Sequence, residues 1–112
     1  MPHYTLYQVV CEATGRSYIG CTTGRVARRI EVHLKRPANQ HLKHDLDLYG
    51  PKAFSVFILD VQDDVFDARR REEELIQEYG ALYPTGYNIC PKSSMSISKL
   101  LSPRYATNLV AE

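Results

Sequence analysis

The sequence lacks any long apolar run. No stretch approaches the roughly 18 apolar residues that a membrane-spanning helix requires. The first residues, Met1 to Tyr4, also lack the basic-then-apolar pattern of a secretory signal. We therefore expect a cytoplasmic protein that does not associate with a membrane.

Cysteine is scarce as well. The chain has 3 cysteines, Cys11, Cys21 and Cys90, and they lie far from one another in the sequence. An odd number at wide spacing fits neither a disulfide framework nor the paired C-x-x-C motifs of a zinc site. We expect all of them to be free, buried thiols.

Neither sign of charge is in excess. Across 112 residues, 14 basic and 13 acidic side chains leave a net charge of +1, and the composition of 44% apolar and 24% charged residues is typical of one globular domain. The distribution is uneven, because basic residues gather between positions 25 and 43, where Glu31 is the only acid. Acidic residues collect at 60–67 and 72–78. The sequence therefore predicts a basic flank on a near-neutral protein.

Apolar periodicity and turn residues predict elements in the order β-β-α-α-β-α. They are strands at 4–11 and 17–22 joined by a turn that uses Gly15, a helix at 25–35, a helix capped by Asn39 and ended by Gly50-Pro51, a strand at 54–59, and a helix that is capped by Asp63 or Asp64, runs to Tyr79 and is ended by Gly80. The nearly continuous apolar run at 54–59 predicts a central strand. Residues 91–112 are rich in serine and form a tail with a short helix opened by Ser102-Pro103, which leaves residues 1–90 as the folded domain.

Glu72 lies on the apolar stripe of the last helix, at helical spacing from Val65, Ala68, Leu75, Ile76 and Tyr79. A carboxylate in that position must be paired, hydrogen-bonded or bound to a metal. A structural ion pair with Arg69 or another arginine is one explanation. The first helix places Arg29 and His33 on the same face as its apolar residues, which favours a shared polar site instead.

Tyr7 and Tyr18 fall on the two strands of the predicted hairpin. The residue numbers of each pair in a hairpin add to the same value, so Tyr7 and Tyr18 face the same side of the sheet only when that value is odd. Pairing Cys11 with Arg16 around the turn from Glu12 to Gly15 meets this condition, with Gly15 free to adopt a positive φ. We predict this register.

Two other polar groups have simpler explanations. His41 and His44 with Asp45 and Asp47 are spread around a helix beside Leu42 and Leu46, and we interpret them as a solvated face rather than a metal cluster. The run Arg69-Arg70-Arg71 is interpreted as ordinary helix surface.

Several landmarks occur in a recognisable order. They are Thr5-Leu6-Tyr7-Gln8-Val9, Ser17-Tyr18-Ile19-Gly20-Cys21-Thr22, Arg29-x-x-x-His33, Glu72-x-x-x-Ile76 and Gly86-Tyr87-Asn88-Ile89. Together they resemble the GIY-YIG nuclease domain over residues 4–89. The homing-endonuclease branch is suggested by Asn39, Leu42, Tyr49-Gly50 and Phe54. The departure is Thr5-Leu6-Tyr7 in place of Gly-Ile-Tyr, which keeps the tyrosine.

The resemblance implies an α+β fold, with a small three-stranded antiparallel sheet flanked by helices. It also implies roles for individual residues. Glu72 matches the metal-binding glutamate, for Mg²⁺ or Mn²⁺, and Arg29 matches the arginine on the scissile phosphate. Tyr7 matches a general base, although a free phenol titrates near 10 and needs help to act near neutral pH. Tyr18 borders the site, and His33 either assists or is a satisfied helix histidine.

Supporting residues follow from the same resemblance. Gly20 and Asn88 are expected to have structural roles around the site and not to take part in the reaction. Asn88 is expected to form hydrogen bonds that fix the end of the domain beside the site. The basic flank offers contacts with DNA, and its members are Arg25, Arg28, Lys35 and Arg36.

The resulting hypothesis is a metal-dependent DNA endonuclease that hydrolyses phosphodiester bonds, homing-endonuclease-like and encoded by a phage or mobile element. A homodimer on DNA or a separate specificity partner would supply what one small domain lacks. One alternative is a catalytically inactive module that binds DNA or a partner. Another is a structural protein with an accidental tripeptide match.

Overall fold

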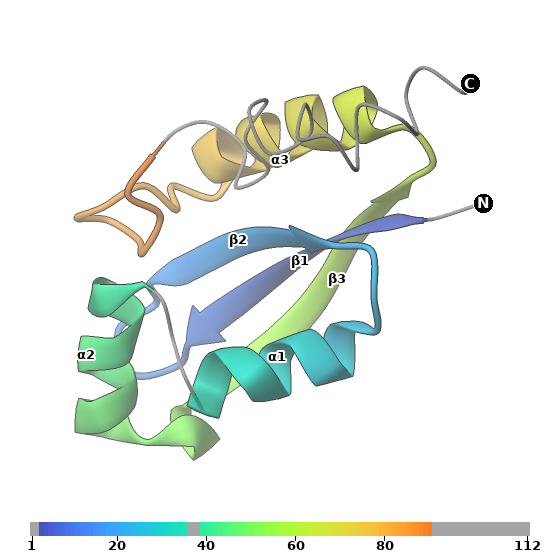
Figure 1. Ribbon diagram of the computed structural model, residues 1–112. Coiled ribbons are helices and arrows are strands. Elements are labelled where there is room, and N and C mark those ends of the chain that lie inside the picture. Colours follow the sequence, from blue (N-terminus) through green and yellow to red (C-terminus); the bar gives the residue numbers. More distant parts are fainter. Residues whose placement is uncertain (1–2, 36–38, 91–112) are drawn as a thin grey trace.

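The computed structural model describes residues 3–35 and 39–90, without the side chains of 33–35 (Figure 1). Its elements are β1 (Tyr4–Cys11), β2 (Ser17–Thr22), α1 (Val26–Lys35), α2 (Gln40–Tyr49), the short 3-10 turn η1 (Pro51–Ala53), β3 (Phe54–Gln62) and α3 (Val65–Glu78). The predicted order β-β-α-α-β-α is confirmed, and only η1 is additional. The predicted tail at 91–112 and Arg36 lie outside the described residues.

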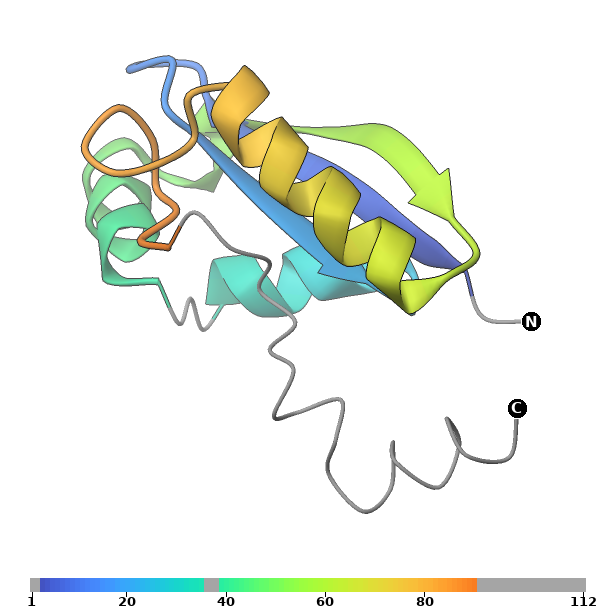
Figure 2. The same cartoon turned by 90° about the horizontal axis from the view of Figure 1, so that it is seen from above.

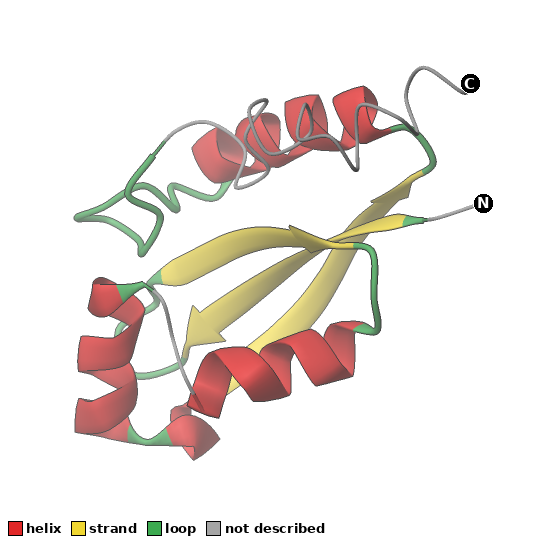
Figure 3. Cartoon of the chain, in the orientation of Figure 1, coloured by secondary structure: helices red, strands yellow, loops and turns green. Residues whose placement is uncertain are grey.

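The sheet has three antiparallel strands in the order β2-β1-β3 (Figure 3). The prediction that the strand at 54–59 is central is therefore wrong, because β1 pairs with both neighbours and β3 lies at an edge. An apolar run indicates only that a strand has much apolar surface, not that this surface is covered. Large apolar side chains of β3 are in fact exposed, among them Phe57 and Ile58.

Polar caps define the helices as predicted. The Asn39 side chain accepts hydrogen bonds from the backbone N–H groups of His41 and Leu42, each at 3.0 Å. Asp64 caps α3 in the same way. Glycines with a positive φ follow both helices, Gly50 with φ 82° and Gly80 with φ 59°.

The hairpin has the predicted register. Tyr7 pairs with Gly20 and Val9 with Tyr18, so the sum is odd and both tyrosines lie on one face. The backbone N–H of Cys11 donates to the carbonyl of Arg16 at 2.9 Å, and Gly15 has φ 78°. The register therefore places both phenols on the same side of the sheet.

Helices pack on both faces of the sheet (Figure 2). On one face, α3 packs over a cluster that includes Leu6, Ile19 and Cys21. On the other face, Ile30 of α1 packs with Tyr7 and Val9. The β2 strand thus has α3 on one side and α1 on the other.

Several smaller predictions need correction. Asp45 is buried rather than solvated, and Cys90 is exposed while the other two cysteines are buried free thiols. Tyr79, expected on the buried stripe of α3, is also exposed. Within the described residues, no helix is both long and apolar enough to cross a membrane.

Candidate active site

The phenol of Tyr7 is the centre of the site. The side chain is only 1% exposed and lies across Gly20, its partner on β2. A Cβ built on Gly20 would lie 2.5 Å from both Cζ and the hydroxyl oxygen of Tyr7. Any side chain at position 20 would therefore displace the phenol, so the glycine is required by close approach and not by its own φ.

Tyr18 is the second tyrosine of the site. Its ring centroid lies 6.5 Å from that of Tyr7, with the planes tilted by 42°. A Cβ on Gly20 would also approach Tyr18, at 3.0 Å from Cε2. The two rings therefore flank one glycine, as the odd register predicts.

Arg29 and Glu72 reach these phenols from opposite layers. Arg29 on α1 is exposed overall but lies within hydrogen-bonding range of the Tyr7 hydroxyl. Glu72 on α3 is 0% exposed, and its charge acts on Tyr7, Tyr18 and the Cys21 thiol. The sequence predicted that these four groups share a site, and the structure places Tyr7, Tyr18, Arg29 and Glu72 together beside β2.

The acidity of these groups reflects burial first and charge second. Burial raises the pKa of Tyr7, the hydrogen bond and charge of Arg29 lower it, and the charge of Glu72 raises it, with a net increase above 10. Burial likewise raises the pKa of Tyr18, and it raises that of Cys21 to about 12. In this arrangement both phenols keep their protons at neutral pH.

The outer edge of β2 is held by the segment that follows α3. The side-chain amide of Asn88 accepts from the Ile19 N–H at 2.9 Å and donates to the Ile19 carbonyl at 3.0 Å. The Tyr87 N–H donates to the Ser17 carbonyl at 2.9 Å. This segment therefore satisfies the backbone of an edge strand on both sides of Tyr18.

A buried polar cluster anchors that segment in turn. The Tyr87 hydroxyl donates to the buried Asp45 carboxylate at 2.7 Å, and Arg16 approaches the same oxygen at 3.5 Å. Asn39 donates from Nδ2 to the Tyr87 carbonyl at 2.6 Å. The sequence did not predict this contact, because Asp45 was interpreted as part of a solvated helix face and Tyr87 only as part of a landmark. Only the tertiary structure brings the two side chains together.

A family model for the GIY-YIG catalytic domain matches residues 3–88. The chain belongs to the GIY-YIG family. Among solved structures, it is similar to a mutant of the catalytic domain of intron endonuclease I-TevI, at 20% identity and a TM-score of 0.71, covering 80% of this chain and 95% of that one. No curated protein matches.

Family membership confirms the resemblance inferred from the landmarks, together with the α+β fold. The chain is therefore an enzyme of the GIY-YIG nuclease family. The Thr5-Leu6-Tyr7 departure leaves the geometry intact, because Leu6 faces the α3 cluster while Tyr7 faces the site.

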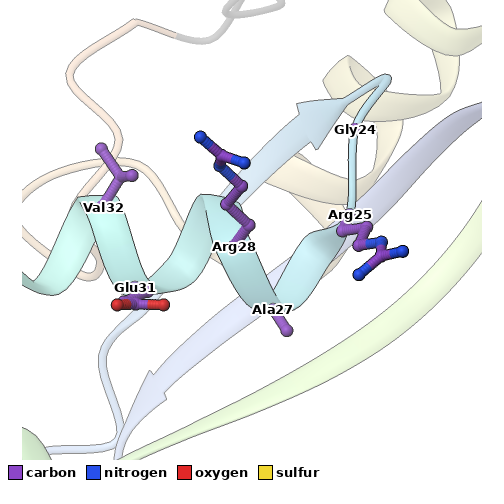
Figure 4. A pocket seen from close by; sticks show the side chains of 6 residues that line it. All are labelled: Gly24, Arg25, Ala27, Arg28, Glu31 and Val32. Carbon is purple, nitrogen blue, oxygen red and sulfur yellow. The ribbon is translucent and has the colours of Figure 1, made fainter.

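Two of the basic residues predicted to contact DNA, Arg25 and Arg28, have side chains that the structure describes. Arg28 on α1 and Arg25, which directly precedes α1, are exposed in the GIY-YIG domain and line an open hollow with Gly24, Ala27, Glu31 and Val32 (Figure 4). The lining of this hollow includes none of Tyr7, Tyr18 and Glu72. The side chains of His33 and Lys35, like the whole of Arg36, lie outside what the structure describes.

The described residues include no group of three or more histidine, cysteine, aspartate or glutamate side chains arranged to hold a metal. A hard divalent cation such as Mg²⁺ does not need such a group, because it keeps several waters and binds through one or two carboxylates together with phosphate oxygens. Glu72, whose charge acts on both phenols, supplies one carboxylate, which matches that pattern and not the three or four protein ligands of a zinc site.

Proposed function

We propose that this GIY-YIG enzyme is a divalent-metal-dependent endonuclease that hydrolyses phosphodiester bonds in DNA, homing-endonuclease-like in origin and acting in the cytoplasm. The observation that supports this most is the convergence on Tyr7 of a guanidinium from one layer and a carboxylate from the other. Phosphate ester hydrolysis needs a cationic hydrogen-bond donor, a carboxylate that can bind a metal and a group that transfers a proton, and Arg29, Glu72 and Tyr7 supply these at one edge of the sheet.

Glu72 is the proposed ligand for Mg²⁺ or Mn²⁺. The side chain is fully buried, and burial of a charged carboxylate lowers the stability of the fold unless interactions inside the site compensate for its lost hydration. When bound, such a cation would supply an activated water and stabilise negative charge on the phosphate.

Arg29 is proposed to bind the scissile phosphate. Its planar, permanently charged guanidinium matches phosphate oxygens in a fork that lysine cannot reproduce. The exposure of Arg29 leaves it accessible to a substrate, while its contact with Tyr7 keeps it at the site. Arg29 therefore has two effects, since it also lowers the pKa of Tyr7.

Tyr7 is the proposed general base, and Tyr18 borders the site beside it. Because burial and the charge of Glu72 raise the pKa of Tyr7, the phenol must first lose its own proton before it can accept one from water, and added positive charge at the site would favour that loss. His33 is a proposed helper from α1. Arg25, Arg28, Lys35 and Arg36 are proposed contacts with the DNA backbone, where they would strengthen binding in a salt-dependent way.

The test is plasmid nicking by the purified full-length chain with Mg²⁺ or Mn²⁺ and with chelator. We expect nicking that requires the metal, and a loss of roughly 1,000-fold in Glu72→Gln, which keeps the size of the side chain. The matched control is Glu73→Gln, the next residue on the same helix, which should cut normally. Thermal melts of both variants separate lost chemistry from lost folding.

Arginine substitutions distinguish the two basic roles. Arg29→Ala should abolish nicking at any DNA concentration, whereas Arg28→Ala should weaken DNA binding and leave the rate at saturation unchanged. A folded wild-type chain that binds DNA without cutting it would identify an inactive binding module instead. Equal activity of Glu72→Gln and the wild type would refute the metal assignment.

A further inference from the structure

The outer edge of β3 is unusual for a small protein. Among the residues that the structure describes, β3 pairs only with β1, so its other edge has no strand beside it (Figure 3). Large apolar side chains are exposed along it: Val56, Phe57 and Val61, with Ile58 the most exposed at 62%. The backbone N–H and C=O groups of an unpaired edge can bond to another strand, and exposed apolar side chains favour that association.

The usual protections of an edge strand are sparse here. The strand Phe54–Gln62 contains no lysine, arginine or proline, and its one charged residue is Asp60. That carboxylate already accepts a hydrogen bond from Arg71 at 3.1 Å. A bulge interrupts the pairing of β1 with β3 between Leu6, which pairs with Asp60, and Tyr7, which pairs with Ile58. The part of β3 from Phe54 to Ile58 pairs without interruption.

Neither helical layer reaches this strand fully. Val56 and Ile58 pair with Val9 and Tyr7, so they lie on the same face of the sheet as these residues. On that face α1 packs against Tyr7 and Val9. Phe57 faces the opposite side, where the α3 cluster extends to Leu59 and leaves Phe57 half exposed. The apolar surface therefore spans both faces of one edge.

We propose that this edge binds a second copy of the chain, with the two β3 strands antiparallel in one continuous sheet. A two-fold axis through Phe57 pairs that residue with its own counterpart and sets Val56 opposite the Ile58 of the second copy. Exposed apolar groups then cover each other on both faces. In this register the two copies of Asp60 are far apart and lie opposite Phe54.

The charge pattern favours this occupant over a nucleic acid. A DNA-binding edge would present basic side chains, whereas this strand has none. A symmetric contact needs a surface that complements itself. A strand with apolar residues on both sides of its midpoint, whose one acid is already paired with Arg71, has this property. One strand pair with a few side chains is a small interface, so we expect a reversible dimer.

The geometry also bears on the reaction, and this step rests on the proposed function. The six strands would follow the order β2-β1-β3-β3-β1-β2, which puts both sites at the outer edges. A two-fold axis perpendicular to the sheet keeps both Tyr7 phenols on one side. Five strand spacings separate the two β2 strands by about 24 Å. One dimer would thus present two hydrolytic sites to one duplex, which would cut both strands faster than successive nicks by one site.

The experiment is sedimentation velocity of the full-length chain without DNA, from micromolar to submillimolar concentration. We expect a monomer–dimer equilibrium that Ile58→Lys shifts to monomer by at least tenfold in dissociation constant. The control is Leu48→Lys on α2, where the replaced side chain has the same 62% exposure. That variant should dimerise like the wild type.

Two results would overturn the proposal: a wild-type chain that stays monomeric at the highest concentration, or a dimer that Ile58→Lys leaves intact. Nicking is measured separately on the same samples. A wild-type chain that nicks DNA but stays monomeric would contradict the dimer and support the nuclease activity. A dimer that does not nick would support the dimer and contradict the nuclease activity. Monomeric Ile58→Lys should still nick but should linearise plasmid more slowly.

Discussion

The two edges of this sheet are built in opposite ways. At the β2 edge, the backbone of Ser17 and Ile19 is satisfied by Tyr87 and Asn88, and polar groups gather beside it. At the β3 edge, no described strand pairs with the backbone, and large apolar side chains are exposed. The same strand geometry therefore gives a closed, polar edge and an open, apolar one.

The difference shows what an edge must have before it can support chemistry. A catalytic constellation requires side chains held within a fraction of an ångström, and a free edge strand would twist and fray. The Gly86–Asn88 segment fixes β2, which carries Tyr18 and Gly20. Gly86 itself has no room for a side chain, because a Cβ there would lie 2.3 Å from the carbonyl oxygen of Ala81.

The substitution expected to affect the polar edge most is Gly20→Ala. The new methyl group would force the Tyr7 ring to move, and a shift on the order of an ångström costs about 100-fold in rate. Plasmid nicking measures this. Gly24→Ala is the control, since a Cβ there meets only Thr22 Oγ1 at 3.8 Å. Normal cutting by Gly20→Ala would mean that the Tyr7 position is not critical.

The next largest effect concerns the closure of that edge. Asn88→Ala removes both hydrogen bonds to Ile19 and leaves buried backbone groups unsatisfied, so the free energy of unfolding should fall by about 2 kcal/mol. Urea denaturation measures this. Thr85→Ala, exposed in the same loop, should change it by less than about 0.5 kcal/mol. If the two variants were equally stable, the edge would not depend on Asn88.

A smaller effect should appear at alkaline pH, because the polar edge buries phenols and the apolar edge does not. The pKa of Tyr7 is raised above its unfolded value of 10, so its neutral form stabilises the fold below pH 10 and that stability is lost as pH rises through the folded pKa. Each such phenol steepens the decline by about 1.4 kcal/mol per pH unit. Tyr7→Phe should flatten the decline of the unfolding free energy with pH, measured by chemical denaturation above about pH 10. An unchanged slope would contradict this burial effect.

Much of the fold was predictable because its signals are local. Asn39 and Asp64 cap helices through their own side chains, and the hairpin register follows from turn length and Gly15. The site residues were predictable for a related reason. Glu72 is a carboxylate on an apolar stripe, and such a mismatch between a residue and its position is visible in a sequence.

Other features depend on which surfaces meet. The apolar run of β3 suggested a central strand, but burial of a strand depends on its neighbours and not on its own composition. Asp45 looked solvated because nothing in its own helix predicts that Tyr87, far along the chain, donates to it. Gly20 was expected to support the site, but the physical reason, the Tyr7 ring that lies across it, is visible only in the tertiary structure.

The sequence by itself determined the elements, their caps, the hairpin register and the set of residues that resembles a nuclease site, because each depends on spacing along the chain. Only the tertiary structure decided the strand order, the burial of Asp45 and the closure of β2 by Tyr87 and Asn88. These depend on contacts between segments distant in sequence, whose free energy comes from the packing of surfaces that no local pattern specifies.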